Sequence, residues 1–207
     1  MLVLKKAFQQ EVFMSREDQK MRSESVRQAI LDTALEIGLE EGFEAISIRK
    51  IISRMRYSTG VIYHYFQDKQ EVIDAIEASE AARLAARIQA ATDENCDIVA
   101  NMLSVFHEVM LLAKEEPEKY NLIVLHKYSK KKAILSPWVS YLADKINKDI
   151  EAGLLRQMDP GHAAFCLWSS FLGFNLTISR MDHLSHEEAE ALFNTQASII
   201  MKGILNL

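Results

Sequence analysis

The chain has few residues that interrupt regular structure. Its 207 residues include only seven glycines and three prolines. Because Gly and Pro mark most turns, this scarcity disfavours many short strands joined by tight turns and favours long helices. The two cysteines, Cys96 and Cys166, are far apart in the chain, and each falls within a helical apolar pattern. A disulfide framework is therefore not indicated, and we expect buried free thiols in a reducing compartment.

Long apolar runs are also missing. No run approaches the ~20 residues that span a bilayer, and residues 1–10 lack the apolar core of a signal peptide. We therefore expect no membrane partner and a cytoplasmic location. Apolar residues make up 49% of the chain and charged residues 26%. This composition is typical of a folded globular protein and not of a disordered one.

Charge is unevenly distributed along the chain, whose net charge is −5. Residues 45–69 are basic, so the remainder is more acidic than the total indicates. A small basic segment on an acidic protein suggests one surface that faces a polyanion, although basic side chains also cluster by chance. The segment contains Arg49, Lys50, Arg54, Arg56 and Lys69 against the single acid Asp68.

Hydrophobic periodicity and capping residues predict an all-α fold of nine helices. Gly42 is expected to end the first helix with a positive φ, and Ser185 with Glu188 forms a capping box for the last. Asp159-Pro160 is a cap followed by a proline in the first helical turn. The predicted helices are 23–41, 48–55, 59–65, 69–91, 98–112, 117–132, 137–152, 160–179 and 186–205.

The second and third predicted helices are short and joined by a tight turn, which is the helix-turn-helix plan. The third begins with the small polar residues Ser58, Thr59 and Gly60. A recognition helix needs such residues because its start must enter the major groove and approach phosphates closely. Ile62 and Phe66 are expected to face inward. The pattern predicts binding to double-stranded DNA.

The residues around this motif carry a family resemblance. The chain has Ser47-Ile48-Arg49, then STGVIYHYFQDK from Ser58 to Lys69, and later EAGLLR at residues 151–156. Together they resemble the signature of the TetR/AcrR family. The resemblance implies an all-α, nine-helix, two-domain regulator. Its expected parts are a flexible N-terminal tail at 1–21, a helix-turn-helix DNA-binding domain at 22–69 and an effector-binding and dimerisation domain at 70–207.

The resemblance also implies which residues contact DNA. Ser47, Tyr63 and Lys69 would bind phosphates, while Thr59 and Val61 would lie nearest the base edges. For His64 a DNA contact and a solvated side chain both remain open, and core packing is the alternative for Tyr63. The expected DNA-binding set is Ser47, Arg49, Ser58, Thr59, Gly60, Val61, Tyr63, His64 and Lys69.

Two turn residues depart from the family pattern. Arg56 and Tyr57 stand where relatives usually carry Gly-Val. If the first position needs φ > 0, Arg56 adds roughly 1 kcal/mol or more of strain. Tyr57 is expected to be half exposed beside the DNA. Either residue could add phosphate contacts or shift the operator preference.

The C-terminal domain is expected to bind a small-molecule effector. Its Met and aromatic residues suit an apolar or aromatic ligand, and His107 and Asn175 would orient it. Core packing is the alternative for each residue. The expected pocket residues are Met102, Phe106, His107, Met110, His126, Trp168 and Asn175, with Tyr120, Tyr128 and Tyr141 as further candidates.

The last two helices are expected to form a homodimer interface, as in the family. Residues 159–179 are more apolar than the face of one monomer requires, and a dimer would cover the excess. Two recognition helices must also span successive major grooves. The expected interface residues are Phe165, Phe171, Leu172, Leu192 and Ile199.

Catalytic and metal chemistry are not indicated. The chain contains no G-x-S-x-G, P-loop or H-E-x-x-H motif, so we do not expect an enzyme or a cofactor. His183 and His186 are explained by the cap around Ser185 more simply than by a metal. The sequence predicts a ligand-responsive repressor that binds a palindromic operator as a dimer. The alternative is an architectural, non-sensing DNA-binding protein on the same fold, and activation in place of repression stays open.

Overall fold

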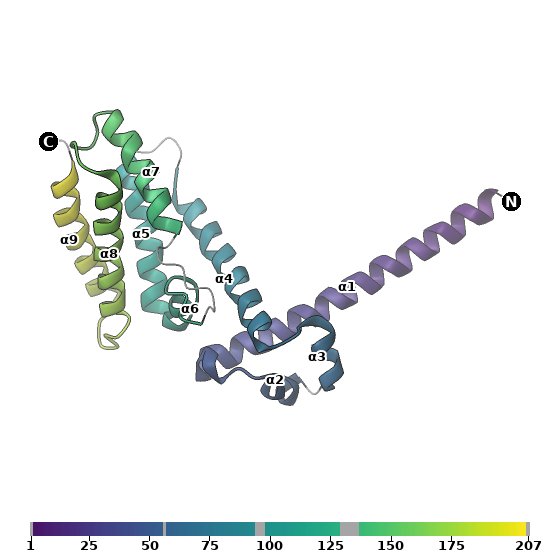
Figure 1. The fold of residues 1–207 in the computed structure, drawn as a ribbon. Coiled ribbons are helices and arrows are strands. Elements are labelled where there is room, and N and C mark those ends of the chain that lie inside the picture. The colour runs from purple at the N-terminus through teal and green to yellow at the C-terminus, as the bar shows by residue number, and fades with distance from the viewer. Residues whose placement is uncertain (1, 56, 94–97, 129–136, 206–207) are drawn as a thin grey trace. The chain divides into compact units, whose positions relative to one another are not determined.

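The computed structural model of the chain describes residues 2–55, 57–93, 98–128 and 137–205. These residues form nine α-helices and one short 3-10 turn (Figure 1). Within them, β structure is limited to one isolated bridge between Leu155 and Leu205. The all-α prediction is confirmed. The chain divides into two compact units, Met1–Ser79 and Glu80–Leu207, and one helix, α4, contains the boundary.

The first unit is built around a core supplied by all of its helices. Its elements are α1 (Leu2–Glu41), the 3-10 turn η1 (Phe43–Ala45), α2 (Ile48–Met55), α3 (Thr59–Tyr65) and the start of α4 (Lys69–Ala91). The buried side chains are mostly aliphatic: Ile30, Ala34, Ile37, Phe43, Ile46, Ile51, Ile62, Phe66, Val72, Ile73 and Ile76.

The predicted bounds of α2, α3 and α4 are confirmed. The Ser47 hydroxyl accepts a hydrogen bond from the backbone N–H of Lys50 at 3.2 Å. Asp68 caps α4 by accepting two backbone N–H groups through Oδ1, at 2.7 and 3.0 Å. Ser58 occupies the N-cap position of α3, but its hydroxyl makes no capping hydrogen bond. Gly42 has φ 87°, as expected where α1 ends.

Helix α1 is longer than the sequence analysis predicts. Residues 1–21 are expected to form a tail, and instead the helix begins at Leu2. The segment contains no Gly or Pro and is rich in Lys, Gln, Glu and Arg, which are good helix formers. Since residues 30–37 are held helical by packing, adding such residues to the existing helix avoids the cost of a new nucleus.

Gly38 is required by the packing of Phe43. A Cβ at Gly38 would lie 2.8 Å from two ring carbons of Phe43, which is fully buried. We expect Gly38→Ala to lower the free energy of unfolding by about 1–3 kcal/mol, because the ring has no room to retreat. Urea denaturation would measure it. Gly60→Ala is the matched control, since nothing lies within 4 Å of its added Cβ; equal losses in both variants would contradict the packing argument.

The second unit contains the rest of α4 and five further helices, α5 (Ile98–Glu115), α6 (Pro117–Ile123), α7 (Pro137–Glu151), α8 (Pro160–Ile178) and α9 (His186–Ile204). Helix α8 packs against α5 and α7, and α5 also packs against α9. At the centre, the rings of Phe106 and Phe171 stack with their centroids 3.9 Å apart. Phe193 lies against Phe171 at 5.8 Å. No helix of the described residues is long and apolar enough to cross a membrane.

The predicted caps of α8 and α9 are confirmed. Asp159 Oδ1 accepts the backbone N–H of His162 at 2.7 Å, and Ser185 and Glu188 make both bonds of the capping box. The predicted end of the helix after Pro117 is wrong, because α6 stops at Ile123 and His126 has φ 48°. A residue in the left-handed region cannot continue a helix. Lys130, Lys131 and Lys132, the last residues of the predicted helix, lie outside the described residues.

Candidate DNA-binding surface and ligand cavity

Helix α3 separates a buried side from an exposed one. Ile62 and Phe66 are buried in the first unit and hold the helix in place, as expected. Arg27 adds its guanidinium over the Phe66 ring, 5.1 Å from the centroid. The exposed side begins with small polar residues and continues with aromatic ones that can donate hydrogen bonds. The residues exposed there are Ser58, Thr59, Gly60, Tyr63 and His64.

The other expected DNA contacts lie on neighbouring parts of the same unit. Arg49 on α2 and Lys69 at the start of α4 are exposed. Ser47 and Val61 are half-buried, and the Ser47 hydroxyl is engaged in capping α2. Whether these residues touch DNA stays a prediction. The unit nevertheless provides what a groove-reading surface needs, which is a short polar helix start flanked by cations.

Two of the basic side chains in residues 45–69 are paired within the unit. Lys50 Nζ lies 2.7 Å from Glu41 Oε2, and Arg54 Nη2 lies 2.7 Å from Glu40 Oε2 and 3.1 Å from Glu41 Oε1. The hydrogen bond from Lys50 lowers the pKa of Glu41 below its ordinary value. Among the described cations of the segment, Arg49 and Lys69 are those left for an external anion.

Of the two turn residues that depart from the family pattern, the structure describes Tyr57 but not Arg56. Tyr57 is 41% exposed, which confirms the expectation of a half-exposed ring. Arg56, for which backbone strain is expected, lies outside the described residues. Nearby, Tyr65 is half-buried, and its hydroxyl accepts a hydrogen bond from Ser23 Oγ at 3.3 Å.

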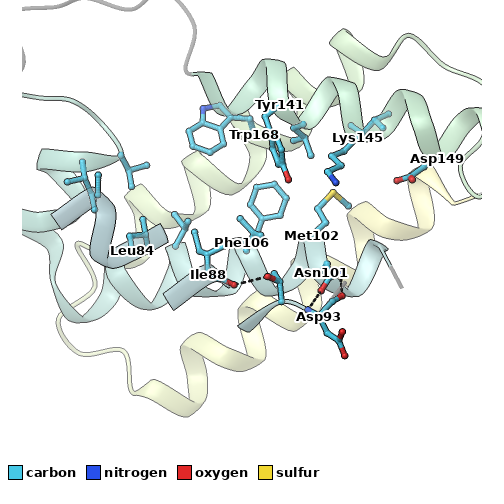
Figure 2. A pocket seen from close by; sticks show the side chains of 18 residues that line it. Leu84, Ile88, Asp93, Asn101, Met102, Phe106, Tyr141, Lys145, Asp149 and Trp168 are labelled. Carbon is cyan, nitrogen blue, oxygen red and sulfur yellow. Dashed lines mark hydrogen bonds between the residues drawn. The ribbon is translucent and has the colours of Figure 1, made fainter. Parts of the chain in front are cut away.

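The second unit contains a cavity of about 600 Å³ (Figure 2). Its walls come from the part of α4 after residue 80 and from α5, α6, α7 and α8. Of the expected pocket residues, Met102, Phe106 and Trp168 line it, together with the further candidate Tyr141. A cavity of this size with a mostly apolar lining suits a small organic molecule.

The remaining expected pocket residues do not line this cavity. His107 Nε2 lies 2.7 Å from Glu190 Oε1, and its ring packs edge-on against Phe193. Met110 is buried in the core, and His126 lies in the turn after α6. Helix α5 is apolar on more than one side, so its periodicity could not tell the face toward the cavity from the face toward α9.

Asn175 is a core residue and not a cavity residue. Its side chain faces the hydroxyl of Tyr120, and both residues are buried. Burial raises the pKa of Tyr120 above its ordinary value. Neither Asn175 Oδ1 nor the Tyr120 hydroxyl has a hydrogen-bond partner among the described residues. Exchanging the amide oxygen and nitrogen of Asn175 would let the hydroxyl donate to Oδ1.

The sequence analysis missed the residues that α4 and α7 contribute to the cavity. Leu84 and Ile88, one turn apart on α4, form part of the apolar wall. Tyr141, Lys145 and Asp149 on α7 also line it, and only the first of these was considered. Their spacing of four residues places them on one stripe of the helix. In the sequence, this polar stripe lies beside the apolar residues Leu142 and Ile146 of the same helix, and that pattern could have indicated the face toward the cavity.

A network of charged side chains, here called the α4 clamp, joins α4 to α5 and the start of α6. Glu80 is only 5% exposed and lies 3.2 Å from Lys119 Nζ, while Arg87 Nη2 lies 2.9 Å from Glu108 Oε2. Lys119 also pairs with Glu116. Although burial opposes its charge, the hydrogen bonds that Lys119 donates to Glu116 and Glu80 raise its pKa. The clamp consists of Glu80, Arg87, Glu108, Glu116 and Lys119.

The expected dimer residues divide into exposed and buried ones. Phe165 (53% exposed), Leu192 and Ile199 (69%) are exposed on α8 and α9, and Leu172 is half-buried. Phe171 is 1% exposed within the protomer, so the prediction that it lies in the interface is wrong. Helix α8 is apolar on both sides, and the sequence pattern does not separate the inner side from the outer one.

Cysteine and histidine side chains of the second unit are the remaining candidates for thiol and metal chemistry. Cys166 is exposed, so the expectation of a buried thiol is wrong there, and Cys96 lies outside the described residues. His186 Nε2 lies 3.7 Å from Glu190 Oε1, and His162 is beside its own cap at Asp159. In the part of the chain that the structure describes, no three His, Cys, Asp or Glu side chains are placed to hold a metal ion.

Comparison with known proteins gives matches at both the sequence and the fold level. The profile of the family "Bacterial regulatory proteins, tetR family" matches residues 30–76. The repressor AcnR of Corynebacterium efficiens is 32% identical over 95 residues, which are 46% of this chain and 44% of that protein. AcnR of Corynebacterium glutamicum is 26% identical over 140 residues, 65% of this chain and 67% of that protein. The first of these matches thus spans less than half of its relative's length.

Several solved structures share the fold. The structure of AibR in complex with isovaleryl coenzyme A and operator DNA has a TM-score of 0.62 at 20% identity, covering 84% of this chain and 97% of that one. A putative tetR family regulator from Shewanella sp. PV-4 has a TM-score of 0.65 at 17% identity, covering 88% and 99%. The SmeT–triclosan complex has a TM-score of 0.63 at 17% identity, covering 88% and 92%.

Proposed function

We propose that the chain is a member of the tetR family of bacterial regulatory proteins and acts as a DNA-binding transcriptional repressor that responds to a small-molecule effector. One observation carries the proposal. Within the matched segment, α3 exposes Thr59 and Gly60 at its start while Ile62 and Phe66 anchor it from behind. Such a helix can enter the major groove with little change in its own unit. The role is binding and not catalysis.

The repressor acts as a homodimer in this proposal. A palindromic operator presents two half-sites about 34 Å apart, so two copies of α3 are needed. Phe165, Leu192 and Ile199 give α8 and α9 exposed apolar side chains that a second copy would cover. Because the two half-sites are equivalent, an interface that pairs the same surface on both copies meets the requirement.

The effector acts through α4 in this proposal. Leu84 and Ile88 line the cavity, and the same helix begins at Lys69 in the DNA-binding unit. An effector that changes how residues 81–92 pack on α5 therefore acts on the helix that carries Lys69. The α4 clamp holds that part of the helix in the present arrangement. The effector must bind the DNA-incompetent state more tightly, since otherwise no equilibrium shifts.

Selection of bound sequences from a random pool of double-stranded DNA tests the proposal. The full chain would be used at about 150 mM salt, where weak non-specific contacts are screened. We expect recovery of an inverted repeat bound by a dimer. Recovery of no motif, with binding that vanishes as salt rises, would instead support an architectural protein that reads no operator.

Substitution of the expected phosphate contacts would weaken binding to every sequence alike. We expect Tyr63→Phe and Lys69→Ala to lower affinity, the lysine change also reducing the slope of log K against log salt by about 1 per protomer. Fluorescence anisotropy with labelled DNA at several salt concentrations would measure both. Lys148→Ala, an exposed lysine of the second unit, is the control. If both variants bind DNA as the wild type does, the docking is wrong.

A charge on the exposed apolar side of α9 would separate the copies. Ile199 is 69% exposed, so we expect Ile199→Glu to leave the protomer folded and to shift it from dimer to monomer. Sedimentation equilibrium would measure the mass, and the monomer would lose operator affinity. Leu39→Glu, at an exposed leucine of the first unit, should leave the dimer intact. A wild-type mass for Ile199→Glu would place the interface elsewhere.

A further inference from the structure

The cavity of the second unit has an apolar end and a polar end. In Figure 2, Leu84 and Ile88 lie toward one end, Lys145 and Asp149 lie toward the other, and Phe106 lies between them. Its volume of about 600 Å³ falls in the range of sites for drug-sized molecules. A molecule that fills both ends must therefore be amphipathic.

Most polar groups of the lining are already engaged by the protein. Asn101 Oδ1 accepts the backbone N–H of Asp93 at 2.9 Å, and Asn101 Nδ2 donates to the Asp93 carbonyl at 2.6 Å. Thr92 Oγ1 donates to the Ile88 carbonyl at 3.0 Å. Asp149 is 8% exposed and also interacts with a group of the protein. These side chains already bond to the protein and hold the walls of the cavity together.

Lys145 is the exception. Its half-buried side chain runs from α7 into the cavity, toward Met102 (Figure 2). Its Nζ lies 5.7 Å from the centre of the Tyr141 ring, and among the described residues it forms no ion pair with a carboxylate. A partly desolvated ammonium without a counter-ion is unfavourable, and a bound anion would relieve that cost.

We infer that the cavity binds an amphipathic organic anion, with its apolar body along Leu84, Phe106 and Trp168 and its acidic group paired with Lys145. This assignment rests on the proposed role of the cavity as the effector site. A cationic ligand is disfavoured because both acids of the lining, Asp93 and the buried Asp149, already interact with groups of the protein. Lys145 thus selects the charge of the effector, and the apolar wall sets the size of its body.

Three probes with the same hydrocarbon chain test the charge preference. Decanoate, decanol and decylamine carry a negative, a neutral and a positive end at neutral pH, and their binding to the full chain would be measured by titration calorimetry. We expect decanoate to bind at one site per protomer and about tenfold more tightly than decanol, with decylamine weakest. We expect Lys145→Met to remove the advantage of decanoate and to leave decanol unchanged.

Lys148→Met is the matched control, because Lys148 is an exposed lysine on the same helix that does not line the cavity. It should retain the preference for decanoate. Tightest binding of decylamine, equal binding of the three probes, or no binding of any would overturn the inference. If the protein selects an operator but binds none of the three probes, the proposed function stands and only this inference fails. Decanoate binding that depends on Lys145, in a protein that selects no operator, would overturn the proposed function and leave the cavity chemistry standing.

Discussion

We expect Thr59→Glu to lower operator affinity by about 100-fold or more while the protein stays folded. Thr59 is exposed at the first position of α3, where the proposed docking brings it to the base edges. A carboxylate there meets the acceptors of the groove and the negative phosphates, and a loss of roughly 3 kcal/mol corresponds to the hundredfold change. Anisotropy titration with the selected operator would measure the affinity.

The same substitution should not damage the fold. A negative charge in the first turn interacts favourably with the helix dipole, and an exposed side chain has no packing to lose. Thermal unfolding followed by circular dichroism should therefore match the wild type. Thr59→Ser keeps the hydroxyl and is expected to retain most of the affinity. If Thr59→Glu binds the operator like the wild type, α3 is not the helix that reads DNA.

We expect Phe171→Ala to lower the free energy of unfolding by about 3–5 kcal/mol. Phe171 is 1% exposed and lies between the rings of Phe106 and Phe193, at 3.9 and 5.8 Å, so its removal leaves a cavity that rigid neighbours cannot fill. Because Phe106 also lines the ligand cavity, binding of a ligand there should weaken as well. Denaturation by urea at several protein concentrations would measure the loss.

Phe165→Ala on the same helix is the matched comparison. Its ring is 53% exposed in the protomer, so its removal should change the stability of the protomer little and weaken the association of two copies. We therefore expect the loss of stability in Phe171→Ala to be the same at every protein concentration, and the loss in Phe165→Ala to vary with concentration. Should Phe171→Ala alter only the dimer, the residue would belong to the interface after all and the described packing of α8 would be wrong.

Local signals made much of the first unit predictable from sequence. The starts of α2 and α4 follow from the caps at Ser47 and Asp68, α3 begins after Ser58 although its hydroxyl makes no capping bond, and the end of α1 follows from Gly42. Caps depend on residues three or four positions apart, and this information is contiguous in the chain. The choice of Ile62 and Phe66 as the buried side of α3 likewise needed only helical spacing.

Other features depended on packing partners that are distant in sequence. Five basic residues in 45–69 indicated a cationic surface, and only the structure shows that Lys50 and Arg54 pair with Glu41 at the end of α1. Cys166 follows the apolar pattern of α8 and is nevertheless exposed. A sequence pattern records which side chains avoid water, but not which neighbour covers each of them.

The sequence by itself determined the helical class, the helix-turn-helix with its exposed residues Thr59 and Tyr63, and most helix ends. Tertiary structure decided the roles of α5, α7 and α8. It placed Phe171 in the core, His107 against Glu190 and Lys145 in the cavity. A helix that is apolar on several sides has no preferred inner face of its own, so its core, ligand and partner faces are assigned only when the neighbouring helices pack against it.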